Sequence, residues 1–256
     1  MPSPALAADS LKMSFGGHHV IRDMSLSVGE GELVGLIGPN GAGKTTMFNL
    51  LAGTLTPRGG TIRLGDTDVT GLSQQARCSA GLSRSFQIPK PFPRMTVLEN
   101  VMTSAQHQVG ENVLAALLRP GAVAAQERAN VAKARDLLDF VSLAHLENQP
   151  ASVLSGGQRK LLELARVLMT DPKVILLDEP AAGVNPALLD LIIDRIAQIN
   201  ARGIATLLIE HNMDMISRLC SRVVVMAAGQ FLAEGAPAEV TQRPEVVDVY
   251  LDGMPS

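Results

Sequence analysis

The sequence predicts an α/β fold: a mostly parallel sheet flanked by helices and an antiparallel β layer, with an inserted helical lobe. Two short, continuous apolar runs, Leu33–Ile37 and residues 174–177, are typical of strands buried on both faces. Each run is followed by a turn and then by a segment with apolar residues at helical spacing. Strands that alternate with helices in this way form parallel sheets, so we expect a parallel core.

Turn and capping residues mark the ends of the other elements. Asn185 and Pro186, for example, cap a helix that Gly203 ends. The expected elements are a strand near Val28, strands over residues 61–64, 204–209 and 223–226, a helix over 45–51, and a short tail over 234–250.

The middle of the chain has the pattern of a helical lobe. Pro89, Pro91 and Pro93 exclude a helix, and Thr96 then caps a helical pattern that extends to residue 146, with a break at 119–121. We therefore divide the chain into three parts. These are a discontinuous α/β core at 1–87 and 159–232, a helical lobe at 88–158, and a C-terminal tail at 233–256.

Composition narrows the classes of function. The 256 residues are 46% hydrophobic, which is enough for a sizeable core. A net charge of −3 supplies no basic field, so no nucleic acid partner is expected. Any phosphate group would have to be bound by a local motif. Cys78 and Cys220 lie far apart in sequence, which fits a reducing compartment. Without a signal peptide or an apolar run of roughly 20 residues, we expect a soluble chain that reaches a membrane only through partners.

Residues 38–45, Gly-Pro-Asn-Gly-Ala-Gly-Lys-Thr, match the phosphate-loop pattern between a strand and a helix. The glycines let backbone N–H groups converge on phosphate oxygens, and the following helix presents its positive end. We expect Lys44 to bind the β- and γ-phosphates of ATP and the Thr45 hydroxyl to ligate Mg²⁺. The predicted ATP-binding residues of this segment are Gly38, Pro39, Asn40, Gly41, Ala42, Gly43, Lys44, Thr45 and Thr46.

Asp178 and Glu179 follow the buried run at 174–177, at the carboxyl end where α/β sheets bind ligands. Two carboxylates at this place are costly to bury unless they serve a ligand. We expect Asp178 to hold Mg²⁺ and Glu179 to polarise the attacking water, because phosphoryl transfer depends on an oriented nucleophile. The alternative, a pair of solvated carboxylates, is disfavoured by the phosphate loop in the same chain.

Residues 154–158, Leu-Ser-Gly-Gly-Gln, precede a helical pattern, so they form a second helix N-terminus that can bind an anion. Taken alone, such a segment is usually a turn. Together with the phosphate loop, Gln87, Asp178-Glu179 and His211, in this order, it resembles the ATP-binding cassette of ABC transporters over nearly the whole chain. The resemblance implies the ABC ATPase form of the phosphate-loop NTPase fold.

The resemblance also implies a role for each motif. In that family, the segment that corresponds to 154–158 closes over the ATP held by a second cassette in a head-to-tail dimer. Gln87 is implied to ligate Mg²⁺ and sense the γ-phosphate from the hinge between the lobes, and His211 to position water beside Glu179. On their own, a solvated glutamine and a core histidine are the ordinary interpretations. The residues implied to act on ATP in trans are Leu154, Ser155, Gly156, Gly157 and Gln158.

Two further positions follow from the resemblance. Phe15 precedes the phosphate loop where the family places an aromatic residue that stacks on adenine, although simple packing is the alternative. Asn185 stands where the family usually has an aspartate. This departure implies that communication across the dimer is tuned differently, while hydrolysis is not excluded.

Several segments narrow the resemblance to the ATPase subunits of branched-chain amino-acid importers; they are residues 15–17, 84–87, 181–186, 209–213 and 250–251. In such systems two different cassettes usually pair beneath two polytopic permease subunits, at the cytoplasmic face of the cell membrane. An extracytoplasmic solute-binding protein delivers the substrate. The loop with Phe86, Ile88 and Phe92 is then expected to receive the permease, unless these side chains only fill the gap between the lobes.

Other functions stay open. The cassette could belong to another transporter, for urea, other amino acids or export. A soluble ABC ATPase that acts on DNA or ribosomes is disfavoured, because the chain has no long coiled-coil insertion, no second cassette and no basic charge. A phosphate-loop kinase has no use for residues 154–158.

Overall fold

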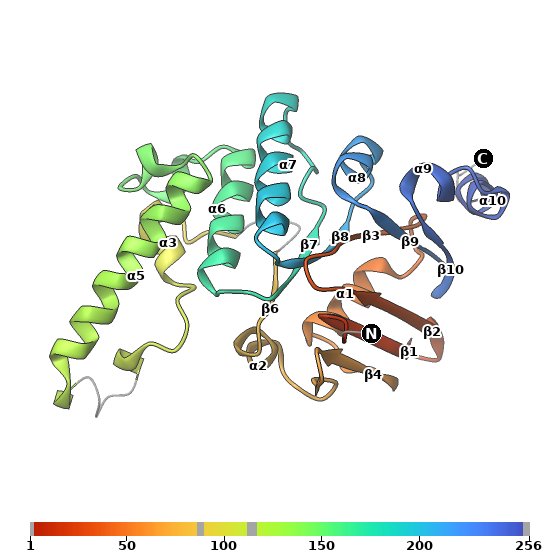
Figure 1. The fold of residues 1–256 in the computed structure, drawn as a ribbon, viewed down its shortest axis with the longest axis horizontal. Coiled ribbons are helices and arrows are strands. Elements are labelled where there is room, and N and C mark those ends of the chain that lie inside the picture. The colour runs from red at the N-terminus through yellow and green to blue at the C-terminus, as the bar shows by residue number, and fades with distance from the viewer. Residues whose placement is uncertain (1–2, 86–89, 112–116, 253–256) are drawn as a thin grey trace.

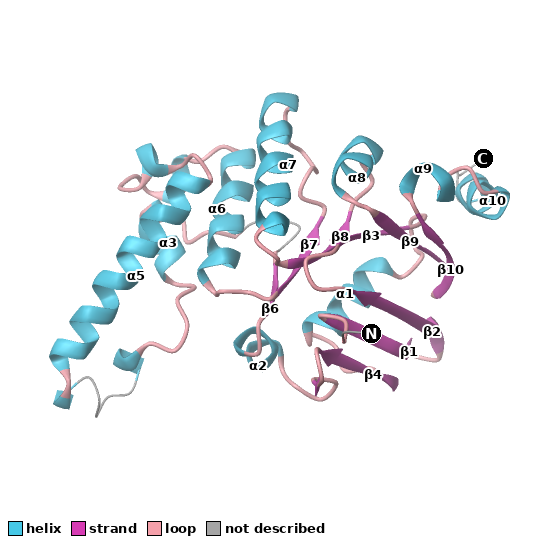
Figure 2. Cartoon of the chain, in the orientation of Figure 1, coloured by secondary structure: helices cyan, strands magenta, loops and turns pink. Residues whose placement is uncertain are grey.

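A computed structural model of the protein describes residues 3–85, 90–111 and 117–252. Within these residues, ten strands form one sheet in the order β5-β4-β1-β2-β10-β9-β3-β8-β7-β6. Figures 1 and 2 show helices packed on the parallel strands and a second group of helices that projects away from the sheet. The predicted α/β fold is confirmed.

The parallel part of the sheet contains the strands that the sequence predicts most directly. They are β3 (Leu33–Ile37), β6 (Leu82–Arg84), β7 (Val174–Asp178), β8 (Ala205–Ile209) and β9 (Arg222–Ala227). β3 pairs in parallel with β8 and β9, and β7 pairs in parallel with β8 and β6. The carboxyl ends of these strands therefore lie along one edge of the sheet.

An antiparallel layer adjoins the parallel strands, as expected. Its strands are β1 (Leu6–Phe15), β2 (His18–Val28), β4 (Gly59–Leu64) and β5 (Thr67–Asp68). Strand β10 (Gln230–Gly235) joins the two parts, because it pairs with β9 on one side and touches β2 on the other. Figure 1 shows α1 (Lys44–Ala52) between this layer and the parallel strands.

Alternate side chains of the parallel strands enter two hydrophobic cores. Val34 and Leu36 of β3 belong to the core that contains β1, β2, β4 and α1. Leu33 and Ile37 belong to the other, which contains α7 (Pro186–Ala201) and α8 (Met213–Leu219). Because side chains along a strand alternate between faces, the continuous apolar runs reflect burial on both sides.

The helical lobe consists of α3 (Val97–Met102), α5 (Pro120–Phe140) and α6 (Gly156–Met169). Thr96 caps α3, and α5 begins at Pro120, inside the predicted break at 119–121. Helix α6 runs across the predicted boundary between residues 158 and 159, so lobe and core share it, and the division into domains stays a prediction. Within the described ranges, no helix has the length and apolar character needed to cross a membrane.

The C-terminal residues, expected to form a short tail, are folded against the sheet. After β10 the chain forms α9 (Pro237–Val240) and α10 (Pro244–Asp252), and Val240 and Val246 are buried. Tyr250 of α10 contacts the start of the phosphate loop. Burial raises the pKa of the Tyr250 phenol, and a hydrogen bond from the Gly38 backbone N–H opposes this shift. The end of the described chain thus lies beside the phosphate loop.

Candidate functional site

The predicted site segments come together at one edge of the sheet. The phosphate loop follows β3, His211 follows β8, and Asp178 and Glu179 end and follow β7. Since β3, β8, β7 and β6 are neighbouring parallel strands, these segments are adjacent, where α/β sheets place ligands. Gln87 follows β6 but lies outside the described residues, so its role stays a prediction.

The phosphate loop is packed so closely that glycine is required at two positions. Gly38 and Gly43 have φ values of +152° and +103°. A Cβ atom at Gly38 would collide with the carbonyl oxygen of Met226 on β9, and one at Gly43 would lie 3.1 Å from the Val20 carbonyl oxygen. Only glycine combines this backbone conformation with this close approach. The loop is thereby held between β2 and β9.

The start of α1 is free of acidic and capping side chains. Gly43 is the N-cap and contributes no side-chain hydrogen bond, and the first turn contains no acidic residue. The N–H groups of the first turn have no partner within the helix, and the helix dipole attracts an anion. Thr45 is exposed there, and Thr46 is half-buried. This end of α1 therefore suits a phosphate group.

Lys44 is turned back onto the loop. Its Nζ donates hydrogen bonds to the carbonyl oxygens of Gly38 (2.6 Å) and Pro39 (3.0 Å). Burial lowers the pKa of the Lys44 ammonium, and the nearby Glu179 opposes this shift. A charged phosphate oxygen is a stronger hydrogen-bond acceptor than a carbonyl, so the ammonium is poised to exchange partners.

Asp178 is held by an arginine that the sequence analysis did not single out. Arg84 donates from Nη2 to Asp178 Oδ2 (2.7 Å) and from Nη1 to Asn49 Oδ1 of α1 (2.6 Å). The side chains of Arg84 and Asp178 are only 10% and 4% exposed. Arg84 thus links the end of β7 to α1. Because 94 residues separate it from Asp178, spacing in the sequence gave no signal for this contact.

Glu179 and His211, two of the three predicted catalytic residues with Gln87 as the third, face each other from neighbouring strand ends. Glu179 Oε1 lies 3.3 Å from His211 Nε2, and both side chains are partly exposed. Glu179 has the unusual φ of +48°, and its N–H donates to the Ile209 carbonyl oxygen of β8 (2.9 Å). The carboxylate also interacts electrostatically with Lys44. A water molecule beside Glu179 would therefore be close to the phosphate loop.

Glu210, which the sequence analysis did not single out, holds the backbone on both sides of the site. Its buried carboxylate accepts hydrogen bonds from the backbone N–H groups of Ala181 (2.6 Å), His211 (2.9 Å) and Asn212 (3.0 Å). These bonds tie the segment after β7 to the segment after β8. Glu210 thus fixes the backbone on which Glu179 and His211 are mounted.

Residues 154–158 form a capped helix start. Ser155 Oγ accepts from the Gln158 N–H (3.3 Å), and Gln158 Oε1 accepts from the Ser155 N–H (2.9 Å). Leu154 is buried, whereas Ser155 and Gly156 are exposed. The segment therefore presents polar and backbone groups to the outside, and its action on the ATP of a second cassette stays a prediction.

Phe15 and Asn185 occupy local positions that agree with their proposed roles. Phe15 lies at the turn between β1 and β2 and is 46% exposed, so its ring is accessible, while stacking on adenine stays a prediction. Asn185 is the N-cap of α7, where its Oδ1 accepts from the Leu188 N–H (3.0 Å). Asparagine and aspartate serve equally well as N-caps, so the departure costs the helix nothing.

The expected permease-binding loop is partly described. Phe92 is 49% exposed, and the buried side chain of Asn100 holds its backbone by accepting from the Phe92 N–H (2.8 Å). Phe86 and Ile88 lie outside the described residues. The Phe92 ring lies 5.8 Å from Arg166 of α6 and is half exposed, so its contact with a permease stays a prediction.

The donor set at this edge fits Mg²⁺. The Thr45 hydroxyl and the Asp178 carboxylate supply oxygen ligands, which this ion prefers. In the part of the chain that the structure describes, no group of three or more His, Cys, Asp or Glu side chains could hold a metal by itself. The residues present thus suit an ion that shares its coordination with phosphate oxygens, with Thr45 and Asp178 as the protein ligands.

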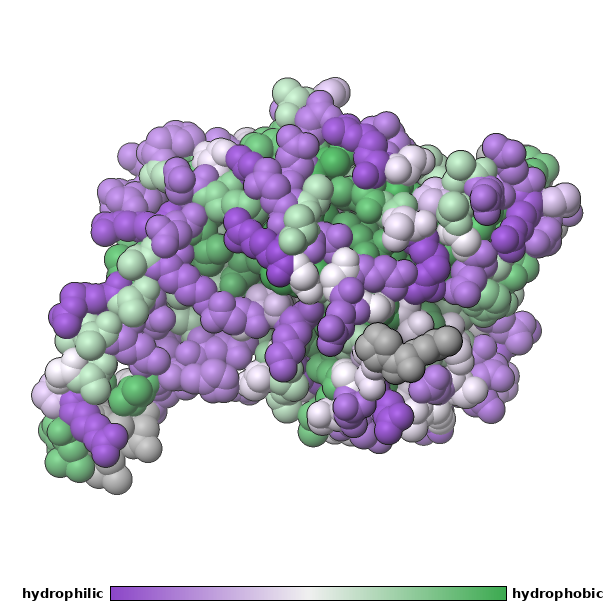
Figure 3. Space-filling view, in the orientation of Figure 1, coloured by the Kyte–Doolittle hydropathy of each residue, from purple (hydrophilic) through white to green (hydrophobic). Residues whose placement is uncertain are grey.

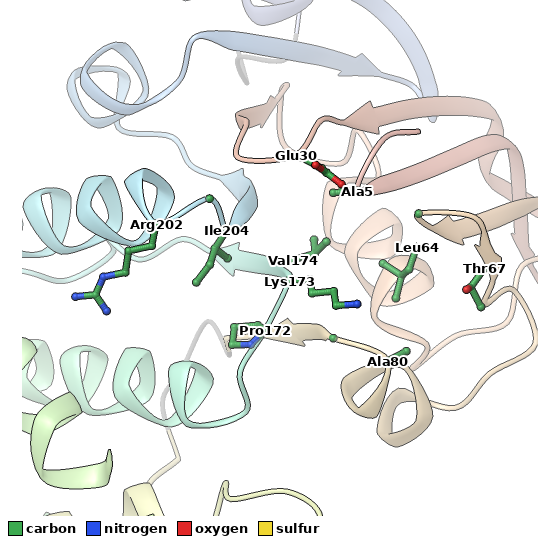
Figure 4. A pocket seen from close by; sticks show the side chains of 13 residues that line it. Ala5, Glu30, Leu64, Thr67, Ala80, Pro172, Lys173, Val174, Arg202 and Ile204 are labelled. Carbon is green, nitrogen blue, oxygen red and sulfur yellow. The ribbon is translucent and has the colours of Figure 1, made fainter. Parts of the chain in front are cut away.

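A separate cavity lies at the opposite edge of the sheet. Figure 4 shows Lys173, Val174 and Ile204 on its wall, at the amino ends of β7 and β8, with Leu64 and Thr67 of the antiparallel layer across from them. Its volume is about 470 Å³. Because the phosphate loop follows the carboxyl end of β3, this cavity does not belong to the candidate site.

The phosphate loop after β3, the carboxylates after β7 and the open start of α1 define a phosphate-loop nucleotide-binding protein. The family model described as ABC transporter matches residues 21–182. The chain therefore belongs to the ABC transporter family, as an ATP-binding cassette.

Relatives of nearly the same length extend this result. The chain is 38% identical over 252 residues to the high-affinity branched-chain amino acid transport ATP-binding protein BraF of Pseudomonas aeruginosa, covering 98% of this chain and 99% of the relative. It is 36% identical, with the same coverage, to LivG of Escherichia coli, which has the same description. The resemblance to this importer group is thus confirmed at the level of sequence.

Solved structures agree. A nucleotide-free ATP-binding cassette from an ABC transporter matches with a TM-score of 0.83 and 34% identity, covering 98% of this chain and 99% of that chain. A cassette of an ABC transporter in its ADP conformation matches with a TM-score of 0.82, the same identity and the same coverage. The fold is therefore that of the cassette throughout its length.

Proposed function

We propose that this protein is the ATP-binding and ATP-hydrolysing subunit of an ABC importer. The observation that carries the proposal is the meeting of Lys44, Glu179 and His211 at the carboxyl ends of neighbouring parallel strands. This arrangement combines a phosphate-binding helix start with a carboxylate and an imidazole that can orient water. Membership of the family supports the same activity.

The geometry and the family resemblance support the following role for each residue. The N–H groups at the start of α1 bind the phosphates, and Lys44 exchanges the carbonyl oxygens of Gly38 and Pro39 for phosphate oxygens. Glu179 accepts a hydrogen bond from the attacking water and removes its proton, while His211 orients the water and the γ-phosphate. Thr45 and Asp178, together with Gln87, would hold Mg²⁺, which would offset the charge of the β- and γ-phosphates.

A second cassette completes the site. The exposed Ser155 and Gly156, with the other residues of 154–158, bind the γ-phosphate of the opposite protomer. ATP then favours the closed dimer, because it contacts both protomers only in that state. Hydrolysis removes this preference, and the helical lobes transmit the opening to the permeases.

The importer assignment rests on similarity to BraF and LivG. We propose that the chain pairs with a second cassette, different or identical, at the cytoplasmic face of the membrane, beneath two polytopic permease subunits. The loop with the exposed Phe92 is the permease contact. A solute-binding protein supplies a branched-chain amino acid or a related solute; a transporter for urea, for other amino acids or for export is the alternative.

The replacement Glu179→Gln tests the ATPase. We expect ATP binding to be retained and turnover to fall by at least about 100-fold, because the amide cannot accept the proton of water. Phosphate release and equilibrium binding of ATP are the measurements. Glu127→Gln, on the exposed side of α5, is the control for loss of a carboxylate. Turnover near that of the wild type in Glu179→Gln would remove Glu179 from this role.

The transport assignment has its own test. The tagged chain is purified from detergent-solubilised membranes of its own cells, and copurifying proteins are identified by mass spectrometry. Two polytopic subunits are the expected result, and their companion binding protein then gives the solute. Copurification with only ribosomal or DNA-associated proteins would overturn the importer reading.

A further inference from the structure

Helix α6 contacts the candidate site at a second point, beyond its capped start. Lys160 lies in the second turn of α6, two residues after Gln158. Its Nζ donates a hydrogen bond of 2.6 Å to the backbone carbonyl oxygen of Glu179. The helix that begins with residues 154–158 is therefore bonded directly to the peptide of the proposed catalytic carboxylate, within the same chain.

Lys160 is buried enough for this contact to be strong. Burial lowers the pKa of its ammonium. Three carboxylates oppose this shift, those of Glu210, Glu179 and Asp178. The ammonium thus stands in an acidic environment formed by the ends of β7 and β8. A charged donor in such a partly desolvated place binds a carbonyl oxygen more strongly than a neutral donor does.

The residue that Lys160 holds has a conformation that needs support. Glu179 has a φ of +48°, a left-handed value that is unfavourable for a side chain with a Cβ atom. Its N–H is fixed by the Ile209 carbonyl oxygen (2.9 Å). Its carbonyl oxygen accepts from Lys160 and, at 3.2 Å, from the Ala182 N–H. Of these three hydrogen-bond partners of the Glu179 backbone, Lys160 contributes a side chain, and Ile209 and Ala182 contribute backbone groups.

The start of α6 also packs against the helix that follows Glu179. A Cβ atom at Gly157 would collide with the Leu188 side chain of α7. A displacement of the α6 start would therefore change its packing against Leu188 of α7. It would also shift the Glu179 backbone, to which Lys160 is hydrogen-bonded. The helix therefore has two contacts with the segment that carries the carboxylate, one through Lys160 and one through Gly157.

We propose that Lys160 is a positioning residue that aligns Glu179 for hydrolysis according to the position of helix α6. Engagement of residues 154–158 by a second cassette fixes α6, and Lys160 then fixes the Glu179 peptide. The effect on rate is large for a small movement, because a misplacement of about 1 Å at a reacting group costs on the order of 100-fold. This inference rests on the proposed ATPase activity.

The replacement Lys160→Met tests it. Methionine keeps the unbranched stem beside the neighbouring apolar residues and removes only the ammonium, so the fold is expected to persist. We expect kcat for ATP hydrolysis to fall about tenfold or more, with KM and the Kd for ATP unchanged. Lys160→Arg, which keeps a cationic donor, is expected to recover most of kcat.

Lys133→Met is the matched control. Lys133 Nζ also donates to a backbone carbonyl oxygen of α6, that of Met169 (2.9 Å), but at the other end of the helix and beside Asp171. We expect it to lower thermal stability without a change in kcat. In the Glu179→Gln background, Lys160→Met is expected to add no further loss, because both changes act through one carboxylate.

The outcomes separate the inference from the activity on which it rests. Absence of hydrolysis by the wild type, or full hydrolysis by Glu179→Gln, overturns the ATPase proposal itself. With the ATPase established, a wild-type kcat in Lys160→Met, an equal loss in Lys133→Met, or a further loss in the double variant overturns the role of Lys160. If Lys160→Met does not fold, an unfolded Lys160→Arg variant also overturns it, since a positioning role requires rescue by the second cation.

Discussion

The two ends of the same parallel strands differ in how their charged side chains are paired. At the carboxyl ends, Lys44 donates to the carbonyl oxygens of Gly38 and Pro39, and Glu179 faces the partly exposed His211, although Asp178 is ion-paired with Arg84. At the amino ends, Glu32 before β3 accepts two hydrogen bonds from Arg222 of β9, at 2.8 and 3.0 Å. Arg222 donates further bonds to Glu234 and to the Ser27 carbonyl oxygen.

The two ends of α1 differ in the same way, because a buried arginine donates hydrogen bonds to the last turn of this helix. Arg77 is 1% exposed and donates to the carbonyl oxygens of Leu50, Leu51, Leu72 and Thr70, at 2.6 to 3.1 Å. The last turn of α1 is thus satisfied by the protein, whereas its first turn is left for a ligand. One edge of the sheet is built for stability and the other for binding.

The largest effect on stability is expected at Arg77. The replacement Arg77→Met removes a buried donor from four backbone carbonyl oxygens, of which that of Leu50 keeps the Gly53 N–H, and we expect a loss of about 3 kcal/mol in the free energy of unfolding. Urea denaturation of both proteins gives this difference. Arg63→Met on β4, whose side chain is exposed, is the control. A loss below about 1 kcal/mol would show that water or neighbouring groups replace the guanidinium.

The next effect is on binding rather than stability. Lys44→Ala removes the ammonium that we expect to exchange carbonyl oxygens for phosphate oxygens, so the Kd for ATP should rise roughly 10- to 100-fold. Calorimetric titration measures it. Lys173→Ala, at the amino end of β7 and on the wall of the other cavity, is the matched control and should leave the Kd unchanged. Equal Kd values for Lys44→Ala and the wild type would contradict the predicted site.

The smallest effect concerns acid stability. Burial raises the pKa of Glu32, but hydrogen bonds from Arg222 and from the Gly29 N–H outweigh it, and the net shift is downward. A depressed carboxyl pKa stabilises the fold above the ordinary glutamate pKa of about 4.3, and this contribution is lost as the pH falls below it.

Glu32→Gln should therefore lower the free energy of unfolding by about 1 kcal/mol at neutral pH and by less at pH 3. Denaturation curves at the two pH values decide this. Glu30→Gln, two residues earlier, removes a carboxylate while leaving the Arg222 hydrogen bonds in place. If the difference in the free energy of unfolding between Glu32→Gln and the wild type is the same at both pH values, the effect is due to packing and not to ionisation.

Local patterns explain which parts of the molecule the sequence predicts. The strands β3, β7 and β8 are continuous apolar runs, so their burial on both faces is visible in a few residues. The helices α9 and α10 are short, and their placement depends on packing of Val240 and Val246 into the core, which no local pattern reports. The predicted tail was therefore too simple.

The site shows the same division. Lys44, Asp178 and Glu179 are predicted from the sequence because phosphate chemistry places such residues next to strand ends, and the structure brings them to one edge of the sheet. Arg84 and Lys160 were missed, since their contacts join residues 94 and 19 positions apart. Motif spacing reports the groups that touch the ligand, and only the fold reports the groups that hold them.

The contact between Tyr250 and the phosphate loop has an optical consequence. The chain contains one tyrosine and no tryptophan. Apart from the weak emission of phenylalanine, its intrinsic ultraviolet fluorescence therefore arises from a single ring, which lies beside Gly38 of the phosphate loop. The unlabelled protein carries its own fluorescent probe at the loop, and any rearrangement there on nucleotide binding is expected to change the intensity of that emission.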